Sequence, residues 1–540
     1  MRLSSFGLIV AGLCLGAVCP IAVRFGGAPA DSVSDRRQSA VIGTHYWGSA
    51  CPVNFWNSFE ECDLADDFAK IRQDGFNTVI FAIPWHEFEA DSEHMEKRLQ
   101  SVLSAAEKEG LRTAFRLSYY HDILPDPNVA QMKTEILFTS EEARIGWAQH
   151  LRHVWSILQE SPSYDFAFIS WEDFQTVNGI LSQDESVRLR WARDAGYQGY
   201  LREHYSLTDV SKSYGVEFVR YDEIPAPVRT SSAVRYYHEF VDDVLTRRLF
   251  QIARESVPGI SMEIRVDWDL IPEDPPRWFV HKSQYKVTGE REWLAVYFAP
   301  FMFSANAGDE IGADEALGKL NGFIYRTRQL SGARPLFIDQ FNFIDNTVGF
   351  ERNTKISPAA IPEFLVRAGD VIREKTRGYA LWSHKDYIMT PLYNASFERG
   401  LKGWTCDLNN DDHAILRDDR QDSWLRLRAG DSVSQMFRWN TPGQLKVYLQ
   451  ACPEKTDREC RLRVASNVDS KVVPVSGGGC LCVELAGGTE IAIGCESGSI
   501  LVDNVKIAGH AQLNGLYDAF GRERDYAPAV REMNKIISAP

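Results

Sequence analysis

Residues 41–392 contain eight short apolar runs, each followed by an amphipathic stretch. No other feature of the sequence limits the fold as strongly. The run 77–83 (NTVIFAI) is apolar throughout, which is typical of a parallel strand covered on both faces. Eight β-then-α units predict an α/β fold, a closed (β/α)8 TIM barrel with its active site at the C-terminal strand ends. The expected strands are 41–47, 77–83, 112–117, 165–171, 261–267, 293–298, 335–339 and 378–382.

A doubly wound open sheet is the alternative to a barrel. No glycine-rich phosphate loop follows the first expected strand, and this weakens the alternative. The pattern changes near residue 393, where helical periodicity gives way to alternation of apolar and polar residues, as in 445–449. The sequence therefore predicts an antiparallel β-sandwich over 393–508, and residues 513–540 return to a helical pattern.

The N-terminus has the layout of a secretory signal peptide. Arg2 precedes an apolar run over 6–23, and Ala28, Pro29 and Ala30 offer a small-residue cleavage site. We therefore expect residues 1–30 to be a signal peptide and the protein to be secreted or periplasmic. Because the apolar run is long, an uncleaved membrane anchor is the alternative.

Cysteine usage agrees with an oxidising compartment. Beyond the expected signal peptide, two cysteines, Cys51 and Cys62, precede the sandwich, and an even number follows within it. We expect disulfides, with open connectivity among the late six: Cys406, Cys452, Cys460, Cys480, Cys482 and Cys495. A zinc site is the alternative, but Cys480 and Cys482 lack the spacing of a metal knuckle.

The charge balance excludes one class of partner. The chain has 59 Lys and Arg against 74 Asp and Glu, a net charge of -15, which argues against nucleic acid. No nucleotide loop or Ser-His-Asp arrangement is evident, so we expect no cofactor. His150 and His153 lie within one helix, and we expect them at the surface rather than on a metal. The oligomeric state stays open.

Several sequence segments of the barrel region resemble those of a clan of retaining glycoside hydrolases. Residues 67–79 (DFAKIRQDGFNTV) and 84–89 (PWHEFE) are similar to the first helix and second strand of family 42 enzymes. Residues 214–218 and 223–227 resemble the long loop after their fourth strand. The clan, which includes families 5 and 42, implies a catalytic barrel over most of 41–392.

The sandwich carries a second resemblance. Residues 394–404 (NASFERGLKGW) and 502–505 (VDNV) are similar to jelly-roll carbohydrate-binding modules, many of which only brace their host domain. Residues 515–524 (GLYDAFGRER) look like the segment that follows the eighth strand of such barrels. This implies a sandwich inserted between strand 8 and helix 8, with a barrel formed by 41–392 plus 513–540.

The resemblance also implies a catalytic pair. Glycoside hydrolysis uses two carboxyl groups that flank the scissile bond, and in this clan they are glutamates at the ends of strands 4 and 7. Glu172 falls at the first position as acid and base, beside Trp171 where the clan has Asn, and Asp173 could share its role. Asp339 falls at the nucleophile position in place of Glu. The shorter side chain leaves three options, a retaining enzyme, an inverting enzyme or an inactive site.

Other residues project from the same expected face. Tyr297 could bond the nucleophile, and Trp382 could form the floor on which a sugar stacks. The further candidates are His45, Trp47, Trp85, Arg116, His121 and Asp267. Together these features predict an exported glycoside hydrolase that cleaves O-glycosidic bonds of a polysaccharide or oligosaccharide without a cofactor. A non-catalytic sugar-binding or polysaccharide-export accessory protein is the alternative.

Overall fold

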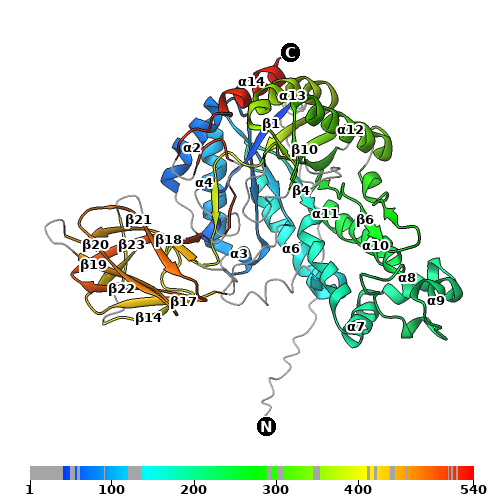
Figure 1. Ribbon diagram of the computed structural model, residues 1–540, viewed down its shortest axis with the longest axis horizontal. Coiled ribbons are helices and arrows are strands. Elements are labelled where there is room, and N and C mark those ends of the chain that lie inside the picture. Colours follow the sequence, from blue (N-terminus) through cyan, green and yellow to red (C-terminus); the bar gives the residue numbers. More distant parts are fainter. Residues whose placement is uncertain are drawn as a thin grey trace, which may run out of the picture. The chain divides into compact units, whose positions relative to one another are not determined.

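The computed structural model describes most of the chain from residue 40 onward (Figure 1). The described ranges are 40–48, 55–57, 61–90, 92–118, 135–288, 293–300, 308–344, 353–409, 414–418, 423–437, 444–455, 460–508, 510–512, 515–518 and 521–539. The expected signal peptide, Cys51 and His121 lie outside these residues. Across the described residues, none of the helices combines the length and apolar character that crossing a bilayer requires.

Eight parallel strands close into a barrel, as the sequence predicts. Neighbours around the barrel follow chain order, and β12 pairs with β1 to close it, with Val41 opposite Gly378. The fifth strand is shorter than expected and ends at Glu263, so Asp267 lies beyond the barrel wall. The strands are β1 (Val41–His45), β2 (Thr78–Ala82), β3 (Arg112–Arg116), β4 (Tyr164–Ser170), β5 (Ser261–Glu263), β8 (Leu294–Phe298), β10 (Leu336–Phe341) and β12 (Gly378–Leu381).

Every second side chain of each strand points into the barrel, and these side chains fill its interior. A separate apolar cluster contains Ala114, Phe168, Ala295, Phe337 and other residues of this face. Because side chains alternate along a strand, the residues two positions further on point to the same interior, at the C-terminal end. Those residues are Arg116, Ser170, Tyr297, Asp339 and, beyond β12, Trp382. The apolar core therefore carries a polar layer at the strand ends.

Helices surround the barrel, and a long excursion follows β4. The covering helices are α2 (Glu61–Gln73), α3 (Trp85–Ala90), α4 (Ser92–Lys108), α6 (Glu141–Leu158), α12 (Ala313–Ser331) and α13 (Ile361–Lys375). The excursion begins with the 3-10 segment η2 (Trp171–Ser182) and α7 (Glu185–Ala195), α8 (Tyr197–His204) and α9 (Leu207–Tyr214). One continuous helical stretch then leads to β5, through α10 (Val234–Asp243), a π-helical turn (Val244–Leu249) and α11 (Phe250–Ser256). The hairpin of β6 (Asp269–Ile271) and β7 (Arg277–Phe279) follows β5.

Two five-stranded antiparallel sheets follow residue 400 and share an apolar core of their own. The first sheet has the order β14 (Thr405–Asp407), β17 (Ser432–Met436), β22 (Glu490–Ser497), β19 (Cys460–Ser466), β20 (Ser470–Val475). The second has the order β15 (Ile415–Arg417), β16 (Ser423–Arg428), β23 (Ser499–Ala508), β18 (Gln444–Pro453), β21 (Gly479–Ala486). These sheets are the β-domain.

The β-domain is C-terminal to all eight barrel strands, which corrects the expectation of a domain inserted into the barrel. The barrel sheet is already complete when β12 pairs with β1, before the β-domain begins. Helix α14 (Ala527–Ser538) comes after the β-domain and packs against α13 (Figure 1). Its Asn534 accepts a hydrogen bond from Tyr379 of β12 at 2.5 Å and donates one to the carbonyl of Asp74 at 2.9 Å.

The prediction of disulfides among the six late cysteines is wrong, because no disulfide joins any two of these described residues. Cys480 and Cys482 are two residues apart on β21, and this spacing holds their Cβ atoms farther apart than the about 4 Å of a disulfide. Cys460 and Cys495 donate their thiol hydrogens to the carbonyls of Ser499 and Ser497, at 3.4 Å and 3.3 Å. An even number of cysteines was therefore a poor guide to pairing.

Candidate active site

Arg116 organises one half of the polar layer. Its guanidinium donates to both carboxylate oxygens of Asp173, at 3.1 Å and 2.6 Å, and to Glu172 at 3.3 Å. Ser118 also donates to Asp173, at 2.5 Å. Burial alone would lower the pKa of Arg116, but Asp173, Glu263 and Glu172 raise it well above its ordinary value. Arg116 is therefore a fixed buried cation that holds the segment after β4 against β3.

A second group of contacts centres on Glu263, the last residue of β5. The carboxyl group accepts hydrogen bonds from Ser170 at 2.7 Å and from the amide of Gln340 at 3.1 Å. The carboxyl group of Asp339 lies next to it, and each of the two groups shifts the pKa of the other. Two adjacent buried carboxyl groups do not both ionise readily, so one of them holds a proton at neutral pH. The interior therefore contains an acid pair, Glu263 and Asp339.

The acid pair is buried and titrates far from ordinary carboxyl values. Burial raises the pKa of Glu263 to about 8 and that of Asp339 to about 7. His45 lies beside it, with Nε2 2.9 Å from the carbonyl oxygen of Asp339 and 3.4 Å from its carboxylate. Burial lowers the pKa of His45 to about 3, so the imidazole is neutral at pH 7 and donates from Nε2 to that carbonyl.

Glu172 is the carboxyl group of this cluster that reaches solvent. Its side chain is 28% exposed, whereas the side chains of Asp173 and Asp339 are 0% exposed. Partial burial of the side chain, followed by the negative charge of Glu263, raises the pKa of Glu172 to about 7. At neutral pH about half of the Glu172 carboxyl groups are therefore protonated, which suits a general acid.

The amide of Gln340 joins the exposed carboxyl group to the buried acid pair. Its Nε2 donates to Glu172 at 2.8 Å and to Glu263 at 3.1 Å. Because both oxygens bond one nitrogen, they lie within about 6 Å of each other. Retaining glycosidases place their two carboxyl groups about 5–5.5 Å apart. This limit holds for Glu172 and Glu263, so these two carboxyl groups lie near enough for paired-carboxyl chemistry.

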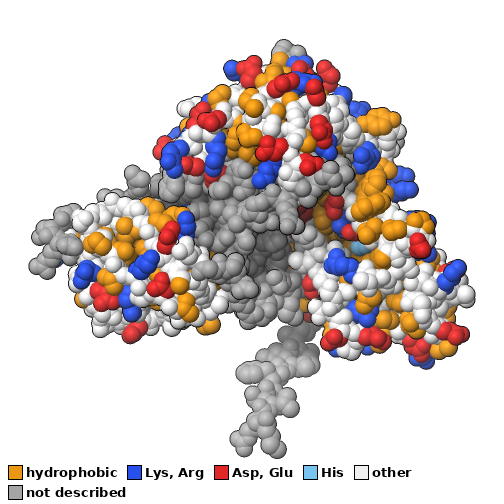
Figure 2. Space-filling view, viewed as in Figure 1, with side chains coloured by type: hydrophobic (Ala, Val, Ile, Leu, Met, Phe, Trp, Pro, Cys, Tyr) orange, Lys and Arg blue, Asp and Glu red, His pale blue; other side chains and the backbone are white. Residues whose placement is uncertain are grey.

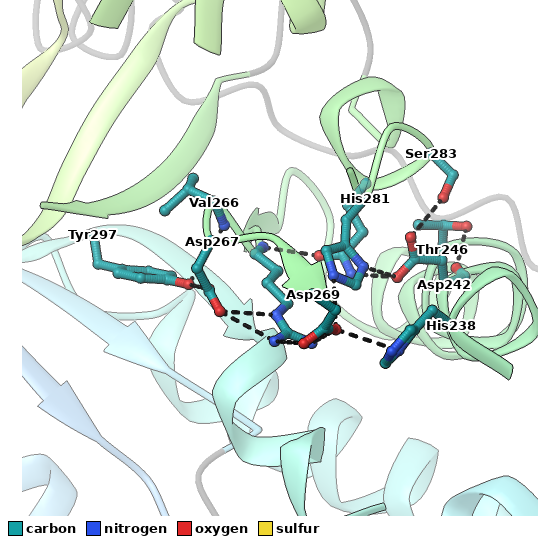
Figure 3. Close-up of polar contacts among 11 residues, drawn as sticks. His238, Asp242, Thr246, Val266, Asp267, Asp269, His281, Ser283 and Tyr297 are labelled. Carbon is teal, nitrogen blue, oxygen red and sulfur yellow. Dashed lines mark hydrogen bonds and ion pairs between the residues drawn. The ribbon is translucent and has the colours of Figure 1, made fainter. Parts of the chain in front are cut away.

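The structure places Tyr297 and Asp267 away from the acid pair. Tyr297 donates its hydroxyl to Asp267 and not to Asp339, as Figure 3 shows. Asp267 also accepts from Arg265 at 3.1 Å, and the guanidinium of Arg265 lies over the ring of Trp171, 4.7 Å from its centroid. These residues form a polar network beside Glu172. The expected bond between Tyr297 and a catalytic carboxylate is not present.

The aromatic candidates divide into two groups. Trp382 lies against His45, with ring centroids 4.6 Å apart, and against Trp47 at 5.5 Å, so it belongs to the strand-end layer. Trp85 instead stacks on His150 of α6, at 6.3 Å, within the outer core. His150 is itself buried, which corrects its expected surface position, and His153 pairs with Glu96 at 2.9 Å.

The sequence pointed to most of this cluster but missed Glu263 and Gln340. Glu263 was missed because the fifth strand was expected to end at Asp267, so Asp267 was taken as its strand-end residue. A charged residue inside the otherwise apolar run Ser261–Ile264 was the available signal, since a buried strand seldom carries an unpaired carboxyl group. Among the described residues, no three His, Cys, Asp or Glu side chains are grouped as ligands for a metal ion.

No protein-family model and no curated protein matches the chain. Solved structures of TIM-barrel glycoside hydrolases resemble it at low identity. A catalytic variant of Gan42B, a GH42 β-galactosidase from G. stearothermophilus, has 12% identity and a TM-score of 0.47, over 64% of this chain and 51% of that one. The exo-β-1,4-mannosidase Op5Man5 from Opitutaceae bacterium strain TAV5 has 17% identity and a TM-score of 0.39, over 64% and 52%.

A GH5_18 protein from Streptomyces cattleya, solved with GlcNAc, has 15% identity and a TM-score of 0.39, over 65% of this chain and 72% of that one. The chain spans about half the length of the β-galactosidase and of the mannosidase. At these identities and TM-scores the comparisons describe a likeness of fold alone.

The pKa of Glu263 predicts how stability depends on pH. Because folding raises this pKa from 4.5 to about 8, the folded state binds the proton more tightly than the unfolded state. The contribution of Glu263 to stability is therefore complete below about pH 4.5 and is lost as the pH rises through about 8. Relative to the wild type, Glu263→Gln should gain roughly 2 kcal/mol or more in unfolding free energy between about pH 5 and pH 9. Urea denaturation at several pH values measures this difference, and a difference that is constant with pH would contradict the assignment.

Proposed function

We propose that this protein is a glycoside hydrolase that cleaves O-glycosidic bonds of a polysaccharide or oligosaccharide. The observation that carries the proposal is the partly exposed Glu172, whose pKa is raised to about 7, at the strand ends of a barrel and beside a buried acid pair. A carboxyl group that is half protonated at neutral pH can give a proton to the departing sugar oxygen.

In the proposed mechanism, Glu172 protonates the leaving oxygen and then takes a proton from water. Asp339 provides the second carboxylate, as nucleophile in a retaining reaction, while Glu263 holds the proton that the acid pair shares. Arg116 lies between Glu172 and Asp173 and limits the build-up of negative charge. Trp382, with Trp47 beside it, supplies the aromatic floor for the sugar ring.

The pH dependence of the rate follows from the role of Glu172. Its pKa of about 7 means that the proton needed for catalysis is lost above neutral pH. We therefore expect kcat/KM to fall as the pH rises through about 7, by about tenfold for each further pH unit. A pH–rate profile on a soluble oligosaccharide measures this, and a rate that stays level up to pH 9 would contradict a protonated Glu172.

Release of reducing ends from a panel of neutral plant and bacterial polysaccharides tests the proposal. The double variant Glu172→Gln, Asp339→Asn is the matched control, because both changes preserve the shape of the side chain. Hydrolysis by the wild type and none by the control would support the proposal. Following the anomer first released by NMR would then separate retention from inversion.

A second candidate is a non-catalytic sugar-binding protein on the same barrel. Two observations favour it: the group of β10 that bonds Glu172 is the amide of Gln340, and the carboxyl group of Asp339 is fully buried. Binding of the panel polysaccharides without any hydrolysis, measured by affinity electrophoresis, would support this candidate over the enzyme.

Export is part of the proposal and is supported by the layout of residues 1–30. Expression of the full chain in its host, followed by N-terminal sequencing of the periplasmic and culture fractions, tests it. A mature N-terminus close after Ala30 is expected, and an intact Met1 in the cytosolic fraction would contradict export. We also propose that the β-domain resembles carbohydrate-binding modules in function, on the strength of residues 394–404 and 502–505.

A further inference from the structure

A groove of about 1020 Å³ opens beside the candidate active site. Its lining comes from η2, from residues 229–234 before and within α10, and from β6. Trp171, the neighbour of Glu172 in the chain, contributes to the lining, so the groove reaches the residue next to the one proposed as the acid. Its volume is at the upper end of the range for small-molecule sites, about 300–1,000 Å³, and exceeds what a single sugar ring needs.

Three polar atoms of the groove lining have no hydrogen-bond partner among the described residues. They are the indole Nε1 of Trp171, Oγ1 of Thr176 and Oδ1 of Asn178, all shielded from solvent. Trp171 is only 8% exposed. Because buried donors and acceptors are almost always paired, these atoms show that the lining holds polar groups in excess of the hydrogen bonds made within it.

An exposed aromatic side chain lies on the hairpin at the edge of the groove. Leu270 of β6 pairs directly with Trp278 of β7, and the two side chains are 51% and 61% exposed. Leu270 also lines the groove, which places this apolar pair at its rim. Figure 2 shows hydrophobic side chains gathered over the region that Figure 1 labels β6 and α10. An exposed indole at the rim of a groove suits the apolar face of a pyranose ring.

The groove carries little net charge. Its charged lining residues are Arg229, Arg265, Glu135 and Asp269, two of each sign. Burial lowers the pKa of the fifth titratable residue, His238, to about 4, so its ring is neutral at pH 7.

The charges at the base of the groove are also held in place by their neighbours. Arg265 pairs with Asp269 at 2.6 Å, and Asp269 lies 3.3 Å from a ring nitrogen of His281 (Figure 3). His281 in turn bonds Asp242, 2.9 Å away. A balanced and internally paired lining favours a neutral ligand over an anionic one.

We propose that this groove binds a run of several neutral sugar units that extends from the bond at Glu172, with Trp278 as the stacking platform. This inference rests on the proposed function and deepens it, because it assigns a chain of sugars as the substrate and cleavage within that chain as the mode of action. Trp171, Thr176 and Asn178 belong to the polar lining along which these units lie.

The test measures binding separately from hydrolysis. Glu172→Gln serves as the background, so that sugars bind without being cleaved, and neutral β-1,4-linked gluco-, manno- and galacto-oligosaccharides of two to six units are the probes in calorimetry. We expect the hexasaccharide of one series to bind at least tenfold more tightly than its disaccharide. Trp278→Ala on this background should weaken hexasaccharide binding about tenfold and leave disaccharide binding unchanged.

Tyr325→Ala is the matched control, because Tyr325 is an equally exposed aromatic residue, 68% exposed, on α12. It should bind the hexasaccharide as the background does. Any one of three results would overturn the proposal. They are hexasaccharide binding that survives Trp278→Ala, an affinity that does not increase with the length of the oligosaccharide, and no binding of any probe. If the wild type binds longer oligosaccharides more tightly but hydrolyses none of them, the proposal for the groove holds and the proposal of an enzyme is rejected.

Discussion

Glu172→Gln is expected to slow the hydrolysis of a polysaccharide about 10³-fold, within the range of about 10²–10⁴ for general acid and base catalysis. Glutamine keeps the size of the side chain and its contact with Gln340, but it has no proton to give to the departing sugar oxygen. The loss should be much smaller on an aryl glycoside with a nitrophenolate leaving group, because that anion departs without being protonated.

The two substrates together separate acid catalysis from simple damage to the site. Steady-state kinetics on both, with circular dichroism to confirm folding, give the comparison. Glu363→Gln, at an exposed carboxyl group of α13, is the control and should retain the wild-type rate. An equal loss on both substrates would mean that Glu172 is not the proton donor. Asp339→Asn, in contrast, should lower both rates together if Asp339 is the nucleophile.

The barrel could be predicted because the burial of its strands on both faces leaves a clear pattern in the sequence. Parallel strands that are covered on both faces must be apolar throughout, so runs such as 77–83 stand out from amphipathic helices. The predicted strands match the observed ones within two residues, except at β5. There the chain leaves the wall at Glu263, although apolar residues continue to alternate beyond it, at Ile264 and Val266.

The candidate site was predicted in part, for a related reason. Residues at strand ends, such as Arg116, Glu172 and Asp339, are brought together by the topology, so their positions in the sequence were sufficient. Contacts that depend on side-chain direction were not predictable. Trp85 follows β2 directly, yet its ring turns to α6, and Tyr297 bonds Asp267 instead of the acid pair. Fold topology thus identifies the neighbourhood of a residue, and packing decides its partner.

Replacement of the buried cation Arg116 should lower the free energy of unfolding more than a substitution at any exposed residue. Arg116 is 2% exposed and pairs with Asp173, whose carboxylate has no access to solvent. Arg116→Leu would leave that carboxylate buried beside Glu172 and Glu263 without a positive neighbour. Removal of one partner from a buried ion pair costs about 3–5 kcal/mol, because the remaining charge is neither solvated nor compensated. We expect this loss in the free energy of unfolding at pH 8, measured by urea denaturation.

The pH dependence of this loss identifies its cause. If charge repulsion among the carboxyl groups is responsible, the cost of Arg116→Leu should shrink as the pH falls toward 5, because the carboxyl groups that lost their cation can then take up protons. A cost that is the same at both pH values would point to lost packing of the arginine side chain instead. Arg367→Leu, which breaks exposed ion pairs with Asp314 and Glu363, is the matched control and should leave the free energy of unfolding nearly unchanged, because water screens exposed pairs. The contrast between the two arginines tests whether the carboxyl cluster depends on one internal cation.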